Sequence, residues 1–199
     1  MENLKPNQHT IIRFLSELTR DWGASVTLEV RCIGENLQPH ASRFAHHAIE
    51  EASENVIAMN RTHNVYACVN PVPDVVRGSA KDADIQRAFF AFVDGDEKGA
   101  ADRAREFDWF DQAMEVVTGV HPYFRNHIYF RFNSPMEDIR QWVELQKLLI
   151  AELKTDKVIH NPSRIMRIAG TVTHPPKKKR ELGYISEVTK LIIGGQYVE

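Results

Sequence analysis

The chain has few of the features that mark secreted or membrane proteins. Its 199 residues include only two cysteines, Cys32 and Cys68, which excludes a disulfide-rich scaffold and gives no second pair for a zinc site. Each cysteine lies in an apolar stretch, so we expect two buried free thiols. No apolar run approaches the ~20 residues that a membrane-spanning helix needs. The N-terminus also lacks the basic-then-apolar layout of a signal peptide, so a cytoplasmic protein with no membrane partner is expected.

Common catalytic motifs are also missing from the sequence. There is no Walker A loop, no GxGxxG fingerprint and no HExxH zinc motif. No serine, cysteine or lysine stands in a nucleophile motif, so nothing indicates covalent catalysis. The net charge is only −2, which means that binding to nucleic acid would depend on local basic patches.

What is present is the composition of an ordinary globular domain, with 43% hydrophobic and 26% charged residues. The length fits one domain over residues 1–199. Apolar spacing predicts helices over residues 6–20, 41–59, 101–117 and 134–153, and strands over 25–33, 64–73, 88–93, 127–132 and 163–174. Glu29 is expected on the polar face of the first strand, and Ser134 as the N-cap of the fourth helix. The alternation predicts an α/β or α+β domain with a mixed sheet.

Two carboxylates, Asp94 and Asp96, end the apolar strand predicted at residues 88–93. Because side chains in a strand alternate between faces, both would lie on one side, about 7 Å apart by strand rise. Such a pair can hold divalent cations, and hard oxygen ligands favour Mg²⁺ or Mn²⁺. Asp-Gly-Asp is also typical of a surface turn, in which Gly95 is free to adopt a positive φ. The pair alone leaves both interpretations open.

A second candidate site lies on the strand around His127. Arg125, His127, Tyr129 and Arg131 share one face of this strand by alternation. Arginine can bind a phosphate through two hydrogen bonds, and histidine adds a donor whose charge is adjustable. The same pattern also fits the solvated outer face of an edge strand, and the strand by itself does not decide between the two.

The third candidate region lies between residues 156 and 180. Asp156 follows the fourth helix, Arg164 and Arg167 flank a short apolar run, and Gly170 permits a close backbone approach. A basic run follows at Lys177, Lys178, Lys179 and Arg180. Such a run could contact a nucleic-acid backbone, although runs of this kind are more often solvated loops.

The order of these segments resembles the archaeo-eukaryotic primase superfamily, and within it the RepB-like primases and primase-polymerases of plasmids and phages. The resemblance covers nearly the whole chain and rests on the segments VTLEVRCIG, NVYACVNPVP, FAFVDGD, VVTGVHPYFRNHIYFRFNSP and NPSRIMRIAGTVTHPPKKKR. It implies an α+β catalytic core with a mixed, largely antiparallel sheet flanked by helices and RRM-like elements. It also implies an N-terminal lobe over residues 1–75 and a metal-site and nucleotide-binding lobe over residues 76–199.

The resemblance further implies a role for each candidate residue. The carboxylates that bind two catalytic Mg²⁺ or Mn²⁺ ions would be Asp94, Asp96 and Asp156. The residues that contact the triphosphate or the template–primer backbone would be Arg125, His127, Arg164 and Arg167. The basic run at residues 177–180 would contact DNA.

The function implied by the resemblance is that of a DNA primase or primase-polymerase. Such a nucleotidyltransferase makes or extends primers on single-stranded DNA from NTPs or dNTPs, and a helicase or helical primase domain is an expected partner. Two divalent ions can carry out this chemistry without a covalent nucleophile, in agreement with the missing nucleophile motifs. Two alternatives stay open: a non-catalytic nucleic-acid-binding module whose acidic cluster is structural, and a metal-dependent nuclease.

Overall fold

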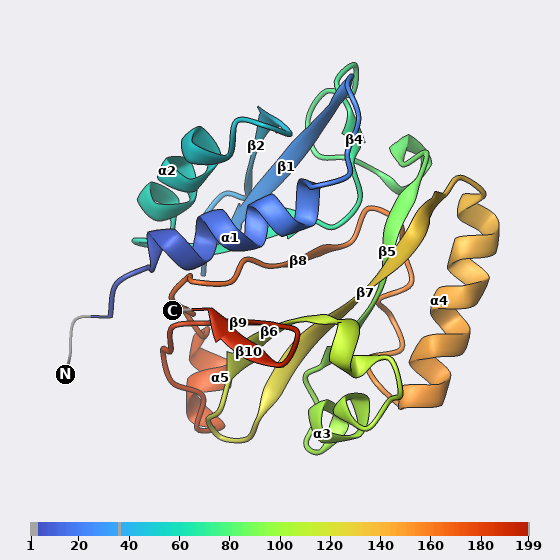
Figure 1. The fold of residues 1–199 in the computed structure, drawn as a ribbon. Coiled ribbons are helices and arrows are strands. Elements are labelled where there is room, and N and C mark those ends of the chain that lie inside the picture. The colour runs from blue at the N-terminus through green and yellow to red at the C-terminus, as the bar shows by residue number, and fades with distance from the viewer. Residues whose placement is uncertain (1–3, 36, 199) are drawn as a thin grey trace.

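Two antiparallel sheets form the frame of the molecule (Figure 1). The computed structural model describes residues 4–35 and 37–198. The first sheet has the order β2-β1-β3-β8, with β4 paired to β1: β1 (Val26–Ile33), β2 (His40–Ala45), β3 (Asn64–Cys68), β4 (Val72–Pro73) and β8 (Ile165–Arg167). The second has the order β10-β9-β6-β7-β5: β5 (Ala88–Gly95), β6 (Met114–Gly119), β7 (Arg125–Met136), β9 (Lys190–Ile193) and β10 (Gln196–Val198). The predicted α+β class with antiparallel pairing is therefore confirmed.

Helices pack against both sheets. Those in the described residues are α1 (Gln8–Thr19), α2 (Ile49–Met59), α3 (Ala100–Arg105), α4 (Ile139–Leu153) and α5 (Lys177–Glu181), with 3₁₀ turns η1 (Asp82–Asp84) and η2 (Phe110–Gln112). Helices α1 and α2 pack against each other beside the first sheet, whereas α4 packs along β5 (Figure 1). Within the described part of the chain, no helix has the length and apolar character to cross a bilayer.

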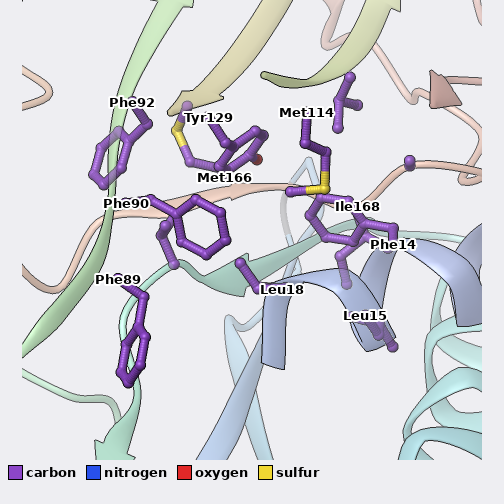
Figure 2. Close-up of a cluster of buried hydrophobic side chains, with 14 of the residues drawn as sticks. Phe14, Leu15, Leu18, Phe89, Phe90, Phe92, Met114, Tyr129, Met166 and Ile168 are labelled. Atoms are coloured by element: carbon purple, nitrogen blue, oxygen red, sulfur yellow. The ribbon is translucent and has the colours of Figure 1, made fainter. Parts of the chain in front are cut away.

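A continuous hydrophobic core connects α1 with both sheets (Figure 2). Helix α1 buries the four residues whose spacing predicted it: Ile11, Phe14, Leu15 and Leu18. From the second sheet, Phe90 and Tyr129 meet edge to face with their ring centroids 6.1 Å apart. Both cysteines are free and buried, as predicted. The apolar run that precedes Asp94 is thus a buried strand, which fixes the position of its carboxyl-bearing end.

Two predicted helices are wrong in part, because sheet pairing overrides their helical spacing. Residues 41–45 belong to β2, which pairs with β1, and the helix begins only at Ile49. The region 101–117 divides into α3, η2 and the first residues of β6. Strand β6 lies between β7 and β9, so its buried residues Met114 and Val117 are held by two neighbouring strands.

The N-terminus of α4 also differs from the prediction. Ser134 lies inside β7, which continues to Met136 because Met136 pairs with Ala88 of β5. The N-cap of α4 is Asp138, whose carboxylate accepts the backbone N–H groups of Arg140 and Gln141 at 3.0 and 3.1 Å. Ser134 and Glu137 therefore form no capping box for this helix.

Glu29 of β1 is fully buried, which corrects its expected place on the polar face. Its carboxylate pairs with Arg31, with Arg43 at 2.9 Å, and with the backbone N–H of Ala80 at 2.8 Å. The two arginines donate in turn to backbone carbonyls of residues 76–80. This network connects β1, β2 and the segment after β4.

Strand β8 joins the first sheet from the far end of the chain. It pairs with β3, with Cys68 opposite Ile165 and Tyr66 opposite Arg167. The expected lobes at residues 1–75 and 76–199 stay a prediction, although β8 shows that the first sheet includes a strand from beyond residue 76. Gly170 follows with φ +80°, and a Cβ there would lie 2.7 Å from the carbonyl oxygen of Asn7, so the expected close backbone approach is present.

Candidate functional site

The pairing of β5 with β7 places Asp94 directly opposite His127. His127 Nε2 lies 3.7 Å from Asp94 Oδ1. Asp96 follows the last residue of β5, and its carboxylate lies 3.6 Å from Arg125 Nε. The structure thus brings together the two predicted carboxylates and the two predicted basic residues of β7.

Gly95 separates the two carboxylates on a crowded face of the sheet. A Cβ at this position would lie 2.5 Å from Asn126 Oδ1 and 2.8 Å from Ala101 Cα. These distances leave no room for a side chain, because α3 packs directly against the end of β5. Of the two interpretations of Asp-Gly-Asp, the surface turn does not apply, because Gly95 lies inside β5. Its missing side chain lets α3 approach the carboxylate-bearing strand.

Asp156 lies beside Asp94 through the backbone. Its N–H donates to the carbonyl oxygen of Asp94 at 3.1 Å, while its carboxylate accepts the N–H of Val158 at 3.0 Å. Among the residues that the structure describes, no group of three or more His, Cys, Asp or Glu side chains is arranged to hold a metal ion. Asp156 is therefore close to Asp94, and one of its two carboxylate oxygens accepts a hydrogen bond within a local turn.

Burial, together with the charges of Asp96 and Asp156, raises the pKa of Asp94 to about 7. Lys179 and Arg164 act in the opposite direction on the same carboxyl group. Three carboxylates are thus close enough to repel one another, which is the electrostatic condition that favours a bound cation. Divalent ions require the ionised carboxylate, so binding at Asp94 would release a proton below pH 7.

We predict a pH-dependent stabilisation by Asp94→Asn in the protein kept free of metal by a chelator. A folded pKa of about 7 for Asp94 means that the folded state holds a proton that the unfolded state has lost, so the contribution of Asp94 to stability falls as the pH rises from about 4 to about 7. The variant should therefore melt above wild type at about pH 8, by about 2–4 °C for each kcal/mol of relieved repulsion. At about pH 4 the difference should vanish; an equal difference at both pH values would contradict the raised pKa.

His127 is buried and neutral. Burial and the nearby charges of Arg167 and Arg164 lower its pKa to about 3. Its Nδ1 atom is buried and has no hydrogen-bond partner among the residues that the structure describes. A neutral imidazole carries one N–H donor, so His127 can act toward an anion as a hydrogen-bond donor rather than as a cation.

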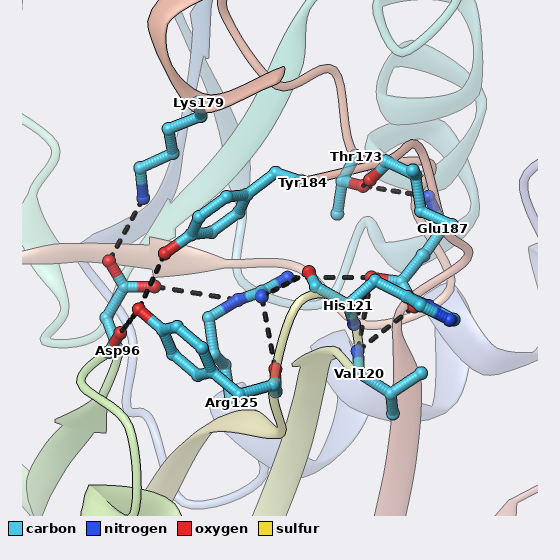
Figure 3. Close-up of polar contacts among 10 residues, drawn as sticks. Asp96, Val120, His121, Arg125, Thr173, Lys179, Tyr184 and Glu187 are labelled. Carbon is cyan, nitrogen blue, oxygen red and sulfur yellow. Dashed lines mark hydrogen bonds and ion pairs between the residues drawn. The ribbon is translucent and has the colours of Figure 1, made fainter. Parts of the chain in front are cut away.

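The arginines differ in how much of their donor capacity is already used. Arg125 is buried, donates to the carbonyl oxygens of His121 and Tyr123, and faces Glu187 at 3.5 Å (Figure 3). Arg167 donates to Asn64 Oδ1 at 2.6 Å and lies over the ring of Tyr66.

Arg164 donates to the carbonyl oxygen of Val158 at 2.6 Å, while its buried Nε has no hydrogen-bond partner within residues 4–35 and 37–198. Of the arginines, Arg125 and Arg167 line the pocket described next. Arg131 lies toward the other end of β7, where it pairs with Asp21.

A pocket of about 390 Å³ opens above the two carboxylates. Its charged and polar wall includes Asp94, Asp96, Arg125, His127, Arg167 and Lys179. Tyr66 and Tyr184 add aromatic surface to the same pocket. Six residues that sequence analysis singled out separately thus face one space large enough for part of a nucleotide.

The basic run at residues 177–180 divides into two parts. It forms α5, in which Lys177, Lys178 and Arg180 are exposed. Lys179 instead donates to Asp96 Oδ2 at 3.0 Å. The sequence predicted contacts with DNA for all four residues and gave no sign that one of them reaches a carboxylate of the site.

Neither a protein-family model nor a curated protein sequence matches this chain. Solved structures do match it. The AEP domain of the cyanophage S-2L primase-polymerase superposes with a TM-score of 0.64, at 23% identity over 98% of this chain and 95% of that one. The primase RepB′ gives a TM-score of 0.60 at 10% identity, over 94% of this chain and 57% of that one. The catalytic domain of RepB′ in complex with initiator DNA gives 0.56 at 10% identity, over 95% and 86%.

This chain has an archaeo-eukaryotic primase fold. The resemblance noted in the sequence is thereby confirmed at the level of the fold, and it extends over nearly the whole chain as expected. At these identities the primase fold is what the likeness establishes, and the roles of individual residues stay predictions.

Sequence analysis missed several residues of this primase-fold pocket. Tyr184 lies outside every motif, yet its ring lies 4.4 Å from the Arg125 guanidinium carbon. Glu187 accepts the N–H groups of Val120 and His121 and so holds the β6–β7 turn. Tyr66 was quoted only as part of a strand. Tyr184 lines the pocket and Glu187 holds the neighbouring turn, and no local signal could have identified either residue, because their segment has no apolar periodicity.

Proposed function

We propose that the chain is the catalytic domain of a DNA primase or primase-polymerase of a plasmid or phage. It would make or extend primers on single-stranded DNA from NTPs or dNTPs. The observation that carries the proposal is the single pocket in which Asp94 and Asp96 face His127, Arg167 and Lys179. A paired acidic site beside basic donors is the arrangement that nucleotidyl transfer needs.

Asp94 and Asp96 are proposed to hold two Mg²⁺ or Mn²⁺ ions, with Asp156 as a third ligand. Carboxylate oxygens are the ligands that these ions prefer, and after burial the charges of Asp96 and Asp156 are the next causes that raise the pKa of Asp94. When bound, such ions help a primer 3′-hydroxyl to attack and neutralise the pyrophosphate that leaves. Asp156 accepts the N–H of Val158 with Oδ1, so its second oxygen would be the one to bind an ion.

The basic residues are proposed to bind the triphosphate and the DNA. His127 would donate one hydrogen bond from a neutral ring, and Arg164 and Arg167 would supply charge. Arg125 would act mainly through its field and by positioning Asp96, because several of its donors are already engaged. The exposed residues Lys177, Lys178 and Arg180 would contact the DNA backbone.

Incubation with single-stranded DNA, with and without an annealed primer, tests the proposal. Labelled NTPs or dNTPs and Mn²⁺ or Mg²⁺ should give products longer than the primer, or new primers where none was supplied. Shortened DNA would indicate the nuclease instead. Binding of DNA without any metal-dependent nucleotide binding would favour the non-catalytic module.

A further inference from the structure

A lysine ammonium already bonds one of the two carboxylates proposed to hold metal. Lys179 Nζ lies 3.0 Å from Asp96 Oδ2, and the contact joins α5 to the end of β5 (Figure 3). Both side chains are partly exposed, at 45% for Lys179 and 41% for Asp96. The contact therefore lies at the mouth of the pocket, where solvent ions can reach it.

The surroundings of Lys179 hold its ammonium at this point. Its Nζ lies 5.0 Å from the centroid of the Tyr184 ring, a cation–π distance. The Tyr184 hydroxyl is hydrogen-bonded to that of Tyr123 at 2.7 Å, and the Tyr123 hydroxyl donates to the backbone oxygen of Asp96 at 2.9 Å. The two tyrosines thus connect both partners of the ion pair.

Helix α5 is also attached at its other side. The carboxylate of Glu35, just beyond β1, accepts the backbone N–H of Lys177 at 2.9 Å and faces Arg180 at 3.4 Å. Lys179 is therefore presented to Asp96 by a segment that is held at both of its sides. The ion pair is a built feature of the pocket rather than one rotamer of a freely moving lysine.

We propose that Lys179 is an exchangeable counterion of the metal site, an inference that rests on the proposed function. In the metal-free protein the ammonium occupies Asp96 Oδ2 and offsets part of the charge of Asp94, Asp96 and Asp156. A divalent ion that binds Asp96 competes with the ammonium for the same oxygen and displaces it. The pair is exposed enough to be weak, so the exchange is easy.

Once displaced from Asp96, the ammonium of Lys179 could bond the triphosphate of a nucleotide in the same pocket. Lys179, His127 and Arg167 all line it, so a triphosphate held by the metal would lie beside the freed lysine. Lys179 therefore opposes binding of the metal alone and favours binding of metal together with nucleotide. These opposite effects on the affinity for metal alone and for nucleotide distinguish a counterion that moves from a lysine that only contacts DNA.

Calorimetric titrations of Lys179→Met and wild type test the inference. With Mn²⁺ alone, we expect the variant to bind about two- to fivefold more tightly, the range for loss of one exposed ion pair. With a non-hydrolysable nucleotide added in the presence of Mn²⁺, we expect about tenfold weaker nucleotide binding, because a charge-assisted hydrogen bond is lost. Lys147→Met removes the same charge from α4, where Lys147 is 47% exposed and pairs with Glu144, and should change neither value by more than about twofold.

The possible results separate this inference from the proposed function. Equal Mn²⁺ affinity in Lys179→Met and wild type overturns the inference and leaves the proposed function standing. No Mn²⁺ binding by wild type overturns both. Lys179→Gln, which keeps a polar side chain without charge, should reproduce the Lys179→Met results; if it binds Mn²⁺ like wild type, the competition by charge is refuted.

Discussion

Replacement of both Asp94 and Asp96 by alanine should abolish primer synthesis. We expect a loss of at least about 10³-fold, the scale on which removal of groups that stabilise transition-state charge acts. Both carboxylates line the pocket with His127 and Arg167. The measurement is the rate of incorporation of labelled nucleotide on single-stranded DNA.

The double variant also needs a measurement that does not depend on catalysis. Burial and the neighbouring carboxylates raise the pKa of Asp94 to about 7, so removal of its charge does not destabilise the folded state. The variant should therefore remain folded and keep its affinity for DNA. Binding of Mn²⁺ should be lost with the activity. A variant that folds, binds DNA and still synthesises primers at the wild-type rate would end the catalytic interpretation of these residues.

The largest effect on stability is expected at Glu29. Glu29→Ala should lower the free energy of unfolding by about 3–5 kcal/mol, because it leaves two part-buried arginines without their shared carboxylate. Arg31 and Arg43 have side chains only 20% and 16% exposed, and the N–H of Ala80 loses its acceptor as well. Urea denaturation of the variant and wild type at neutral pH measures the difference.

Glu35→Ala provides the matched control for Glu29. It removes the same residue type shortly after the same strand, but Glu35 is 41% exposed and pairs with Arg180 at 3.4 Å. A loss of no more than about 1 kcal/mol is expected there. Similar losses in the two variants would mean that burial of Glu29 is not what makes its network important.

A short, aromatic-rich apolar run was enough to predict the strand that carries Asp94. All of residues 88–93 are buried in β5, and Asp94 follows at the end of this run. Predicted element boundaries were wrong where a strand is stabilised by neighbours distant in sequence. Met114 lay in a predicted helix but belongs to β6, which pairs with β7 and β9. The helical period of apolar residues cannot reveal that β6 pairs with β9, because β9 lies far away in the sequence.

The site itself was predicted in its parts but not in its assembly. Asp94, Asp96 and His127 could be named because strand alternation places them. The contact of Lys179 with Asp96 could not, because four adjacent basic residues look alike in sequence and only the orientation of α5 selects one of them. The burial of Glu29 was not predicted for a similar reason, since two of its partners, Arg43 and the N–H of Ala80, lie on other elements.

The pairing of β8 with β3 has a consequence for the order in which the nascent chain can acquire function. The first sheet is complete only when Ile165 pairs with Cys68. The ribosome must add every residue between them before this pairing can form. Arg164 and Arg167 arrive with that same strand. The acidic end of β5 is therefore made well before Arg164 and Arg167, and until β8 is added Arg125 is the arginine that faces Asp96.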